Sequence, residues 1–312
     1  MSVSIANLAV VVVTYNNEAD LPRCLDALQD NAAGAHVVVR DCGSSDQTVD
    51  IARQHAAAEK VIPGANVGFG AASNDAVRSF DRPIEMILFL NPDTAVDCDI
   101  NELLEYVERF GEFGCVGIQQ RSFAGDLVWS WDEFPTAPLE WLKARRSTLL
   151  QRSPAGYTED RQVDWNMGAF LLVPFNAFQA AAGFDERFFL FYEEIDLCQR
   201  LAELGRPTYY VNKFQYQHDR SDKATLWREV LRLNSRREYD RRWLSSFDTL
   251  QCQLAQSYRW IQDFLRPQRA RDRRLVVPRL LATWNLIHAV VPPEDVDASL
   301  DSWQAVRPFW KK

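Results

Sequence analysis

Carboxylates gather at two places along this chain of 312 residues where one expected element gives way to the next. The first is Asn91-Pro92-Asp93, directly after the apolar run 86–90. The second is an acidic triplet within 193–196, which follows a run of aromatic residues and opens an amphipathic stretch. A carboxylate beyond a strand end can face a metal ion or a phosphate, and one at the edge of an apolar pocket can act as a general base. The pattern therefore indicates a site that binds a metal or phosphate and removes a proton.

Each feature also has a plain structural explanation, and on the residues alone both explanations stay open. Asp93 or Thr94 would suit the cap of a helix expected over 101–110. The helix dipole favours acids in a first turn, although it accounts for one member of the triplet more readily than for three. The members of the triplet are Glu193, Glu194 and Asp196. His218 follows a strand expected over 207–211; alone it would be structural, whereas opposite Asp93 it could ligate a divalent metal.

The elements that would position these residues are strands that alternate with helices. Continuous β-branched runs such as 8–13 are typical of strands buried on both faces, and short connections favour right-handed crossovers in a parallel sheet. The expected strands are 8–13, 36–40, 61–62 and 86–90, and the expected helices are 19–29, 47–55, 71–79 and 101–110. The first part of the chain therefore predicts an α/β fold, in which ligands bind beyond the carboxyl ends of the strands.

The glycine-rich segment 64–70 does not match the dinucleotide fingerprint, because it follows the third strand and lacks the G-x-G-x-x-G spacing. No P-loop lysine follows it either. We interpret it as a turn where the backbone approaches a nucleotide or sugar, with Asn66 and Asn74 supplying polar atoms. Tight packing of a helix on a strand explains the glycines equally well.

The pattern becomes irregular after residue 115. Strands are expected near 115–118 and 126–129, and the polar, aromatic segment 133–160 predicts a loop or a helical insert. The segment 163–173 reads as a polar approach to another buried strand, in which Gly168 leaves room for something to come close. Beyond residue 221 the pattern is helical.

Charge is distributed unevenly along the chain. Residues 1–220 hold 18 Lys and Arg against 32 Asp and Glu, whereas 221–312 hold 17 against 11. The acidic body argues against nucleic acid as a partner. The basic end leaves room for contact with an anionic membrane surface, and a solvated helix face is the alternative. Five arginines precede the apolar region 275–291: Arg266, Arg269, Arg271, Arg273 and Arg274.

Targeting signals and cysteines point to a cytoplasmic protein. The first residues lack a basic segment followed by an apolar one, so we expect no signal peptide. No apolar run approaches the roughly 20 residues that span a bilayer. The six cysteines lie far apart without a C-x-x-C pair, which is typical of reduced thiols.

Five short motifs occur in the order found in glycosyltransferase family 2, and over roughly residues 8–240 the chain resembles its bacterial rhamnosyltransferase-like branch. They lie at 12–16, 41–46, 66–70, 91–93 and 193–198. The resemblance implies a GT-A fold, with a mostly parallel sheet flanked by helices and a Rossmann-like nucleotide-binding half. The C-terminal helical region would be an extension of it. It also implies transfer of a sugar from a nucleotide sugar with inversion at the anomeric centre.

Roles follow from the resemblance position by position. Donor-binding residues would be Thr14, Tyr15, Asn16, Asp41, Asn66, Gly68, Asn91 and Asp93. Acceptor-binding residues would be Trp165, Asn166 and Gly168. Asp93 and His218 would bind Mg²⁺ or Mn²⁺, with His218 at the metal or the diphosphate. Glu194 would be the catalytic base, with Glu193 and Asp196 as alternatives, because the usual residue there is an aspartate. Asn91 replaces the first acid of a full D-x-D motif.

We therefore predict an inverting glycosyltransferase that moves a sugar, with rhamnose as a candidate, from a dTDP- or UDP-sugar to a glycan or lipid-linked glycan in surface polysaccharide synthesis. The catalytic domain would span 1–220, with a nucleotide-sugar half (1–115) and an acceptor half (116–220), and 221–312 would form the helical extension. Peripheral contact with the inner face of the membrane would run through the basic C-terminal region. No oligomeric state is predicted. The alternatives are a sugar nucleotidyltransferase, whose basic glycine-rich loop is absent after Val13, and a non-catalytic glycan-assembly scaffold.

Overall fold

The computed structural model describes residues 3–145, 157–218, 225–265, 273–289 and 306–308. The chain divides into two compact units. The first, which we call the sheet unit, comprises 1–134, 154–186 and 193–220. The second, the helical unit, comprises 135–153, 187–192 and 221–312.

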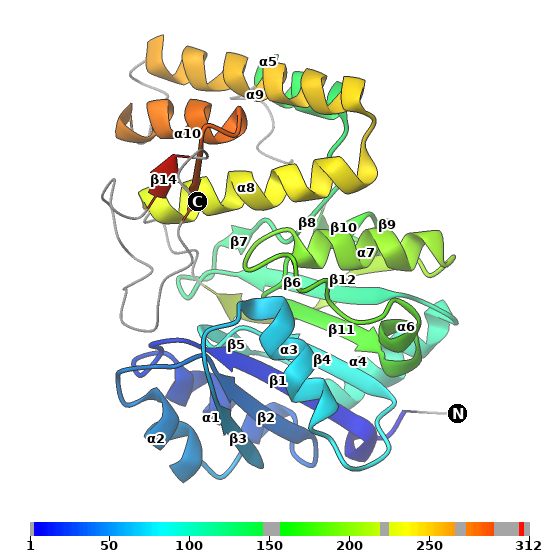
Figure 1. Cartoon of the computed structure of the whole chain (residues 1–312). Helices are drawn as coiled ribbons and strands as arrows, with labels where there is room; N and C mark the ends of the chain where they lie inside the picture. The colour runs from blue at the N-terminus through cyan, green and yellow to red at the C-terminus, as the bar shows by residue number, and fades with distance from the viewer. Residues whose placement is uncertain (1–2, 146–156, 219–224, 266–272, 290–305, 309–312) are drawn as a thin grey trace. The chain divides into compact units, whose positions relative to one another are not determined.

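The sheet unit is built on one large mixed sheet with the strand order β3-β2-β1-β4-β11-β6-β12-β5 (Figure 1). The strands are β1 (Leu8–Thr14), β2 (His36–Asp41), β3 (Lys60–Pro63), β4 (Met86–Leu90), β5 (Thr94–Val96), β6 (Cys115–Arg121), β11 (Phe170–Pro174) and β12 (Thr208–His218). Two more pair at its margin, β7 (Leu127–Val128) with β6 and β9 (Arg161–Val163) with β12. Strands β3, β2, β1 and β4 run parallel, and β11 runs antiparallel to β4 and β6. The predicted α/β architecture is confirmed.

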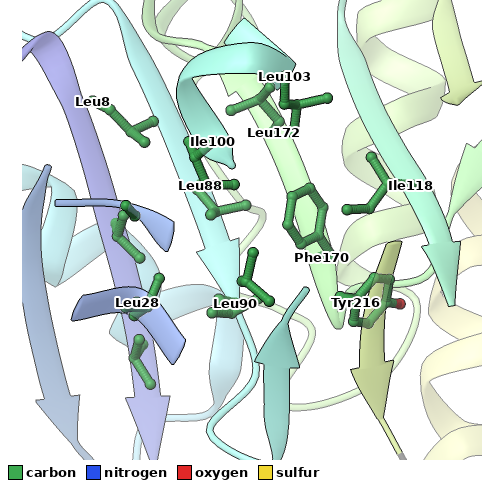
Figure 2. Packing of buried hydrophobic residues seen from close by; sticks show 14 of the residues in the cluster. Leu8, Leu28, Leu88, Leu90, Ile100, Leu103, Ile118, Phe170, Leu172 and Tyr216 are labelled. Carbon is green, nitrogen blue, oxygen red and sulfur yellow. The ribbon is translucent and has the colours of Figure 1, made fainter. Parts of the chain in front are cut away.

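Helices lie on both faces of this sheet (Figure 1). They are α1 (Leu21–Asn31), α2 (Thr48–Gln54), α3 (Phe69–Arg78), α4 (Ile100–Val107), α6 (Phe175–Ala180) and α7 (Glu193–Glu203), with 3-10 turns at Ile5–Asn7 and Glu108–Phe110. On one face, leucines and isoleucines of α1 and α4 pack on alternate residues of β1, β4 and β11 (Figure 2). On the other, Phe89 of β4 meets Phe178 of α6 and Phe184, at ring distances of 5.2 and 4.9 Å. The strands are buried on both faces, as their continuous apolar sequences require.

Two predictions around Asp93 need correction. Thr94 does not cap a helix; it begins strand β5, which pairs antiparallel with the end of β12. Helix α4 is capped instead by Asp99, whose side chain accepts a hydrogen bond from the Asn101 amide. The strand expected over 207–211 was too short, because β12 passes a bulge after Val211 and continues to His218. A strand as short as β5 is fixed by its partner, which its three residues do not reveal.

The helical unit contains α5 (Ala137–Arg145), α8 (Leu226–Trp243), α9 (Ser246–Leu265), α10 (Val276–Thr283), a 3-10 turn (Arg273–Leu275) and a ribbon of β13 (Ile287–Ala289) with β14 (Val306–Pro308). Its core includes Trp227 and Trp260, and the aromatic run before α7 packs against it through Phe189, Leu190 and Phe191. Buried Arg236 bonds Asp240 at 2.6 Å and Glu140 at 3.1 Å. The predicted C-terminal helices are confirmed.

No helix among the described residues is both long and apolar enough to cross a bilayer. All six cysteines are described and free, as predicted. Of the predicted basic membrane segment, Arg266, Arg269 and Arg271 lie outside the described residues.

Candidate active site

The strand order places a topological switch point between β1 and β4. The chain leaves β1 toward β2 on one side, whereas β4 pairs with β1 on the other. Ligands of open α/β sheets bind beyond the strand ends at such a point. Thr14 ends β1, Asp41 ends β2 and Asn91 follows β4, so the predicted donor-binding residues converge there.

The Asp41 carboxylate organises the loop after β2. It accepts hydrogen bonds from Thr14 Oγ1 at 2.9 Å, from the backbone amides of Gly43 and Ser44 at 3.0 and 2.9 Å, and from the Ser44 hydroxyl. Thr14 and Asp41 are each only 1% exposed. Their side chains therefore shape the loop.

Asn16 ties the loop after β1 to the loop after β2. Its backbone has a φ of 54°, its side-chain Oδ1 accepts a hydrogen bond from the Ser45 backbone amide at 2.9 Å, and its own backbone amide donates to Ser44 Oγ at 2.8 Å. The neighbouring Tyr15 amide donates to Asn17 Oδ1 at 2.8 Å. This bonding holds the predicted Tyr15-Asn16 segment in one conformation at the strand ends.

The glycine-rich segment lies beside the same strand ends. Asn66 Oδ1 accepts from the Gly68 amide at 3.3 Å, and Gly68 has a φ of 86° just before α3 begins. A left-handed conformation of this kind favours glycine because it has no Cβ. Gly64 is needed for close packing, since a Cβ there would lie 2.9 Å from the guanidinium of buried Arg40. The backbone of this segment is therefore shaped by glycine at two positions, and approach to a nucleotide or sugar stays a prediction.

Asn74 does not supply polar atoms to a ligand as we predicted. Its Oδ1 accepts from the Phe184 amide at 3.0 Å, and its Nδ2 donates to the Phe184 carbonyl at 2.9 Å and to Glu186 Oε1 at 3.1 Å. A Cβ on Gly183 would lie 2.7 Å from the same amide oxygen. Asn74 therefore has a structural role: its side chain fixes the backbone of the segment before α7.

Two carboxylates at the start of α7 have different surroundings. Glu193 is 5% exposed, and among the described residues its Oε2 has no hydrogen-bond partner. Burial, together with the charge of Glu194, raises the pKa of Glu193 well above its usual value. Glu194 is half-buried. A Cβ on Gly168 would lie 3.8 Å from the Glu194 side chain, and one on Gly70 would lie 3.7 Å from Glu193 Cβ. The pair thus sits between the start of α3 and the approach to β11.

Asp196, the third acid, belongs to the framework. It is fully buried and accepts from Arg200 Nε at 2.8 Å, and Arg200 Nη1 donates to the carbonyl oxygens of Ala181 and Gly183. This ion pair anchors α7 to the turn before it.

Two of the three predicted acceptor residues are buried in the framework. Trp165 and Asn166 are 7% and 1% exposed and form β10 (Trp165–Asn166), which pairs with β8 (Trp131–Asp132). Trp165 Nε1 donates to the Glu133 carbonyl at 3.0 Å, and Asn166 Nδ2 to the Tyr209 carbonyl at 2.9 Å. Gly168 lies at Glu194, and β10 packs against α7.

Asp93 and His218 come together because β5 pairs with the end of β12. His218 Nε2 lies 3.3 Å from Asp93 Oδ2, and the two side chains are 11% and 35% exposed. Behind the ring, Gln120 Nε2 donates to His218 Nδ1 at 3.0 Å and to the His218 carbonyl at 3.1 Å, while Gln120 Oε1 accepts from the Tyr216 hydroxyl at 3.0 Å. Because an amide nitrogen only donates, Nδ1 accepts, and the neutral ring carries its proton on Nε2, facing Asp93.

Gln120 was missed by the sequence reasoning. It is fully buried in β6, and the signal that could have found it is a polar pair, Gln119-Gln120, at the end of an otherwise apolar strand.

A divalent cation fits the Asp93 carboxylate, since Mg²⁺ prefers oxygen ligands and is commonly held by one or two carboxylates plus phosphates and water. No group of three or more His, Cys, Asp and Glu that could enclose a metal occurs in the described part of the chain. As bonded to Gln120, His218 offers a proton rather than a lone pair, which suits a phosphate oxygen. A cavity of about 480 Å³ beside Met86 and Pro174 lies at the opposite end of β4 and contains none of these residues.

Comparison with known proteins agrees with this geometry. A model of the family described as Glycosyl transferase family 2 matches residues 9–186. The chain is 29% identical over 234 residues to N-acetylglucosaminyl-diphospho-decaprenol L-rhamnosyltransferase of Mycobacterium tuberculosis, covering 69% of this chain and 76% of that protein. It is 30% identical over 220 residues to rhamnosyltransferase WbbL of Escherichia coli K12, covering 67% and 82%.

Solved structures share the fold. Staphylococcus aureus TarS aligns over 89% of this chain and 55% of its own, with a TM-score of 0.50 and 16% identity. GalNAc-T7 with UDP, GalNAc and Mn²⁺ aligns over 68% of this chain and 42% of its own, with a TM-score of 0.53 and 12% identity. These likenesses show a GT-A-like arrangement, as predicted. The chain belongs to glycosyltransferase family 2.

Proposed function

We propose that this family 2 glycosyltransferase transfers rhamnose from a nucleoside diphosphate, dTDP or UDP, to a lipid-linked glycan, with inversion at the anomeric carbon. The observation that carries the chemistry is the Glu193–Glu194 pair, placed at Gly168 on one side and at the first turn of α3 on the other. The sugar and acceptor are supported by two relatives whose names specify rhamnosyl transfer, one of them on a diphospho-decaprenol.

The donor is proposed to bind at the switch point. Tyr15, Asn16, Asn66 and Gly68 would contact the nucleotide and sugar, on loops that Thr14 and Asp41 shape from beneath. Asn91, whose amide donates to the Ala169 carbonyl at 3.1 Å, would join the donor side to the approach to β11.

The diphosphate is proposed to lie against Asp93 and His218. Asp93 would hold Mg²⁺ or Mn²⁺, which neutralises charge on a departing diphosphate. His218 would donate its Nε2 proton to a phosphate oxygen, because Gln120 keeps Nδ1 as an acceptor. With Asn91 in place of a second acid, Asp93 is the one carboxylate of this segment available to the cation.

Glu194 is proposed as the base. The acceptor oxygen attacks the anomeric carbon, the bond from that carbon to the diphosphate oxygen breaks, and the hydroxyl proton passes to the Glu194 carboxylate. Burial and the charge of Glu194 raise the pKa of Glu193, so we propose Glu193 as the protonated member of the pair. Glu194, which is half-buried, is proposed as the ionised member, because a base must be ionised to accept the proton. Asp196 is committed to Arg200.

We extend the proposal to the whole protein. Residues 1–220 would be the catalytic domain, with Gly168 on the acceptor side and Trp165 and Asn166 supporting it, and 221–312 would be a helical extension. A lipid-linked acceptor would place the enzyme in the cytoplasm, in peripheral contact with the inner face of the membrane.

The test measures donor binding and transfer separately. Protein is titrated with dTDP-rhamnose and UDP-sugars, with Mg²⁺ or with a chelator, and transfer is followed to an N-acetylglucosaminyl-diphospho-lipid. We expect Glu194→Gln to lower the transfer rate by about 10²- to 10⁴-fold with donor affinity nearly unchanged. Glu193→Gln is the matched control and should keep most of the activity, since glutamine reproduces the uncharged form proposed for Glu193.

Wild-type turnover by Glu194→Gln would remove Glu194 from the role. Binding of no nucleotide sugar under any condition would refute the function and favour a glycan-binding scaffold.

A further inference from the structure

Helix α9 carries a continuous apolar surface on the helical unit. From Leu250 to its end, every exposed residue of α9 is hydrophobic. The exposed fractions are Phe247 68%, Leu250 42%, Leu254 39%, Tyr258 42%, Ile261 47%, Phe264 54% and Leu265 69%. We call these seven residues the α9 stripe. Their spacing of mainly three and four residues places them on one side of the helix, over a length of about 27 Å at 1.5 Å per residue.

The rest of α9 is used for packing within the helical unit. Cys252, Ala255 and Trp260 are buried, and Gln251 accepts a hydrogen bond from Trp141 Nε1 of α5 at 3.0 Å. The α9 stripe is therefore a second apolar face, additional to the one that builds the core. Trp284 extends it: the ring is 40% exposed, and its Nε1 donates to Ser257 Oγ at 2.9 Å.

Such a surface is unusual for a helix that faces water. Single exposed apolar residues are normal, but contiguous patches of this kind mark contacts with a partner or a membrane. An interfacial helix combines an apolar face that includes aromatic residues with basic groups near the bilayer surface. The α9 stripe has Phe247, Tyr258 and Phe264 among its leucines and isoleucine.

Charge selects the occupant. Residues 221–312 hold 17 Lys and Arg against 11 Asp and Glu, in a chain whose net charge is −8. Exposed arginines stand next to α9 in the sequence, with Arg241 and Arg242 before it and Arg274 at the start of the next helix. The excess of Lys and Arg in residues 221–312 would repel the same region of a second copy, whereas anionic lipid headgroups complement it. Asp248 and Asp263 of α9 are both only partly exposed.

We propose that the α9 stripe is a docking surface for an anionic lipid bilayer, into whose headgroup region its apolar side chains insert. Binding of the α9 stripe to lipid is inferred from exposure and charge alone. The purpose of that binding rests on the proposed function, because a lipid-linked acceptor lies at the membrane. It also moves the expected membrane contact from the arginine-rich segment to the apolar side of α9, with arginines as its electrostatic support.

The test is flotation of the full-length protein with vesicles of phosphatidylcholine alone or mixed with phosphatidylglycerol. We expect wild type to float with the anionic vesicles and to be released by added salt. Leu250→Gln with Leu254→Gln should lower the bound fraction at least about tenfold, because two inserting side chains lose their apolar surface. The matched control is Leu127→Gln with Leu204→Gln, exposed leucines of the sheet unit (36% and 49%), which should bind as wild type does.

Each other outcome overturns the proposal. Wild type that stays at the bottom of the gradient excludes a lipid surface. Flotation of the stripe variant equal to wild type assigns binding to another part of the chain, and equal binding to neutral vesicles removes the role of charge. A dimer in light scattering that the stripe variant loses, without vesicle binding by wild type, assigns the stripe to a second copy. Flotation requires no sugar donor, so its result is independent of whether the proposed transfer occurs.

Discussion

Replacing Gln120 with glutamate should reverse the tautomer of His218. In the wild-type protein the amide nitrogen of Gln120 donates both to His218 Nδ1 and to the His218 carbonyl. A carbonyl oxygen only accepts, so the amide cannot turn round without setting two oxygens against each other. A glutamate presents an oxygen to Nδ1 instead. It should therefore draw the proton to Nδ1 and leave the Nε2 lone pair facing Asp93, 3.3 Å away.

The size of the effect follows from the bonds exchanged. A neutral hydrogen bond contributes about 1 kcal/mol, which corresponds to roughly fivefold in a two-state population. A bond to a carboxylate contributes about 1.5–3 kcal/mol, or at least about tenfold in the opposite direction. Two oxygens facing each other in a fully buried site, between the introduced carboxylate and the His218 carbonyl, should also cost about 1–3 kcal/mol of stability. A domain of ordinary stability survives this loss.

The assay is a long-range proton–nitrogen correlation spectrum of the histidine rings, recorded with the rings neutral. His218 is assigned by its loss in His218→Gln, which separates it from the other histidines. Wild type should show the proton on Nε2 and Gln120→Glu should show it on Nδ1. The variant should also bind Mn²⁺ more tightly in the absence of donor, because an imidazole lone pair now stands beside Asp93. A wild-type ring protonated on Nδ1, or identical spectra for the two proteins, would refute the reasoning.

Two further predictions concern stability, measured by urea unfolding. Asn74→Leu leaves the Phe184 amide and carbonyl unpaired in the interior and should lower the free energy of unfolding by roughly 2–5 kcal/mol. The control is Asn101→Leu at an exposed position, which should cost about 0.5 kcal/mol or less; an equally small loss for Asn74→Leu would contradict the structural role of Asn74. Glu193 binds its proton more tightly folded than unfolded, so it lowers stability as pH rises above its ordinary pKa of 4.5 toward the raised value. Glu193→Gln should remove that decline, up to about 1.4 kcal/mol per pH unit in the affected window; parallel stability–pH curves for the two proteins would exclude it.

Motifs that end a strand were located well by the sequence. Asp41, Asn91 and Glu194 each stand at a local signal, either an apolar run that stops or a helix that starts. Each signal lies within a few residues of the residue that it marks. Residues whose role depends on a distant partner were missed or misassigned. Gln120 acts on a histidine 98 positions later, and Asn74 bonds a backbone 110 positions later, so neither role is written in its own neighbourhood.

The two residues before Glu193 show why the exact position of the base could not be predicted. Phe191 and Tyr192 have φ values of 69° and 71°, a left-handed conformation that costs side chains other than glycine about 1–2 kcal/mol each. Neither is a glycine, so no residue type at these positions signals the turn. Their side chains offset the cost within the helical unit, where Phe191 joins the core and the Tyr192 ring lies 5.6 Å from that of Tyr239. The chain then re-enters the sheet unit at Glu193. The backbone turn that leads into α7, and with it the residue at which the helix starts, is therefore stabilised by packing that no local pattern around Glu194 records.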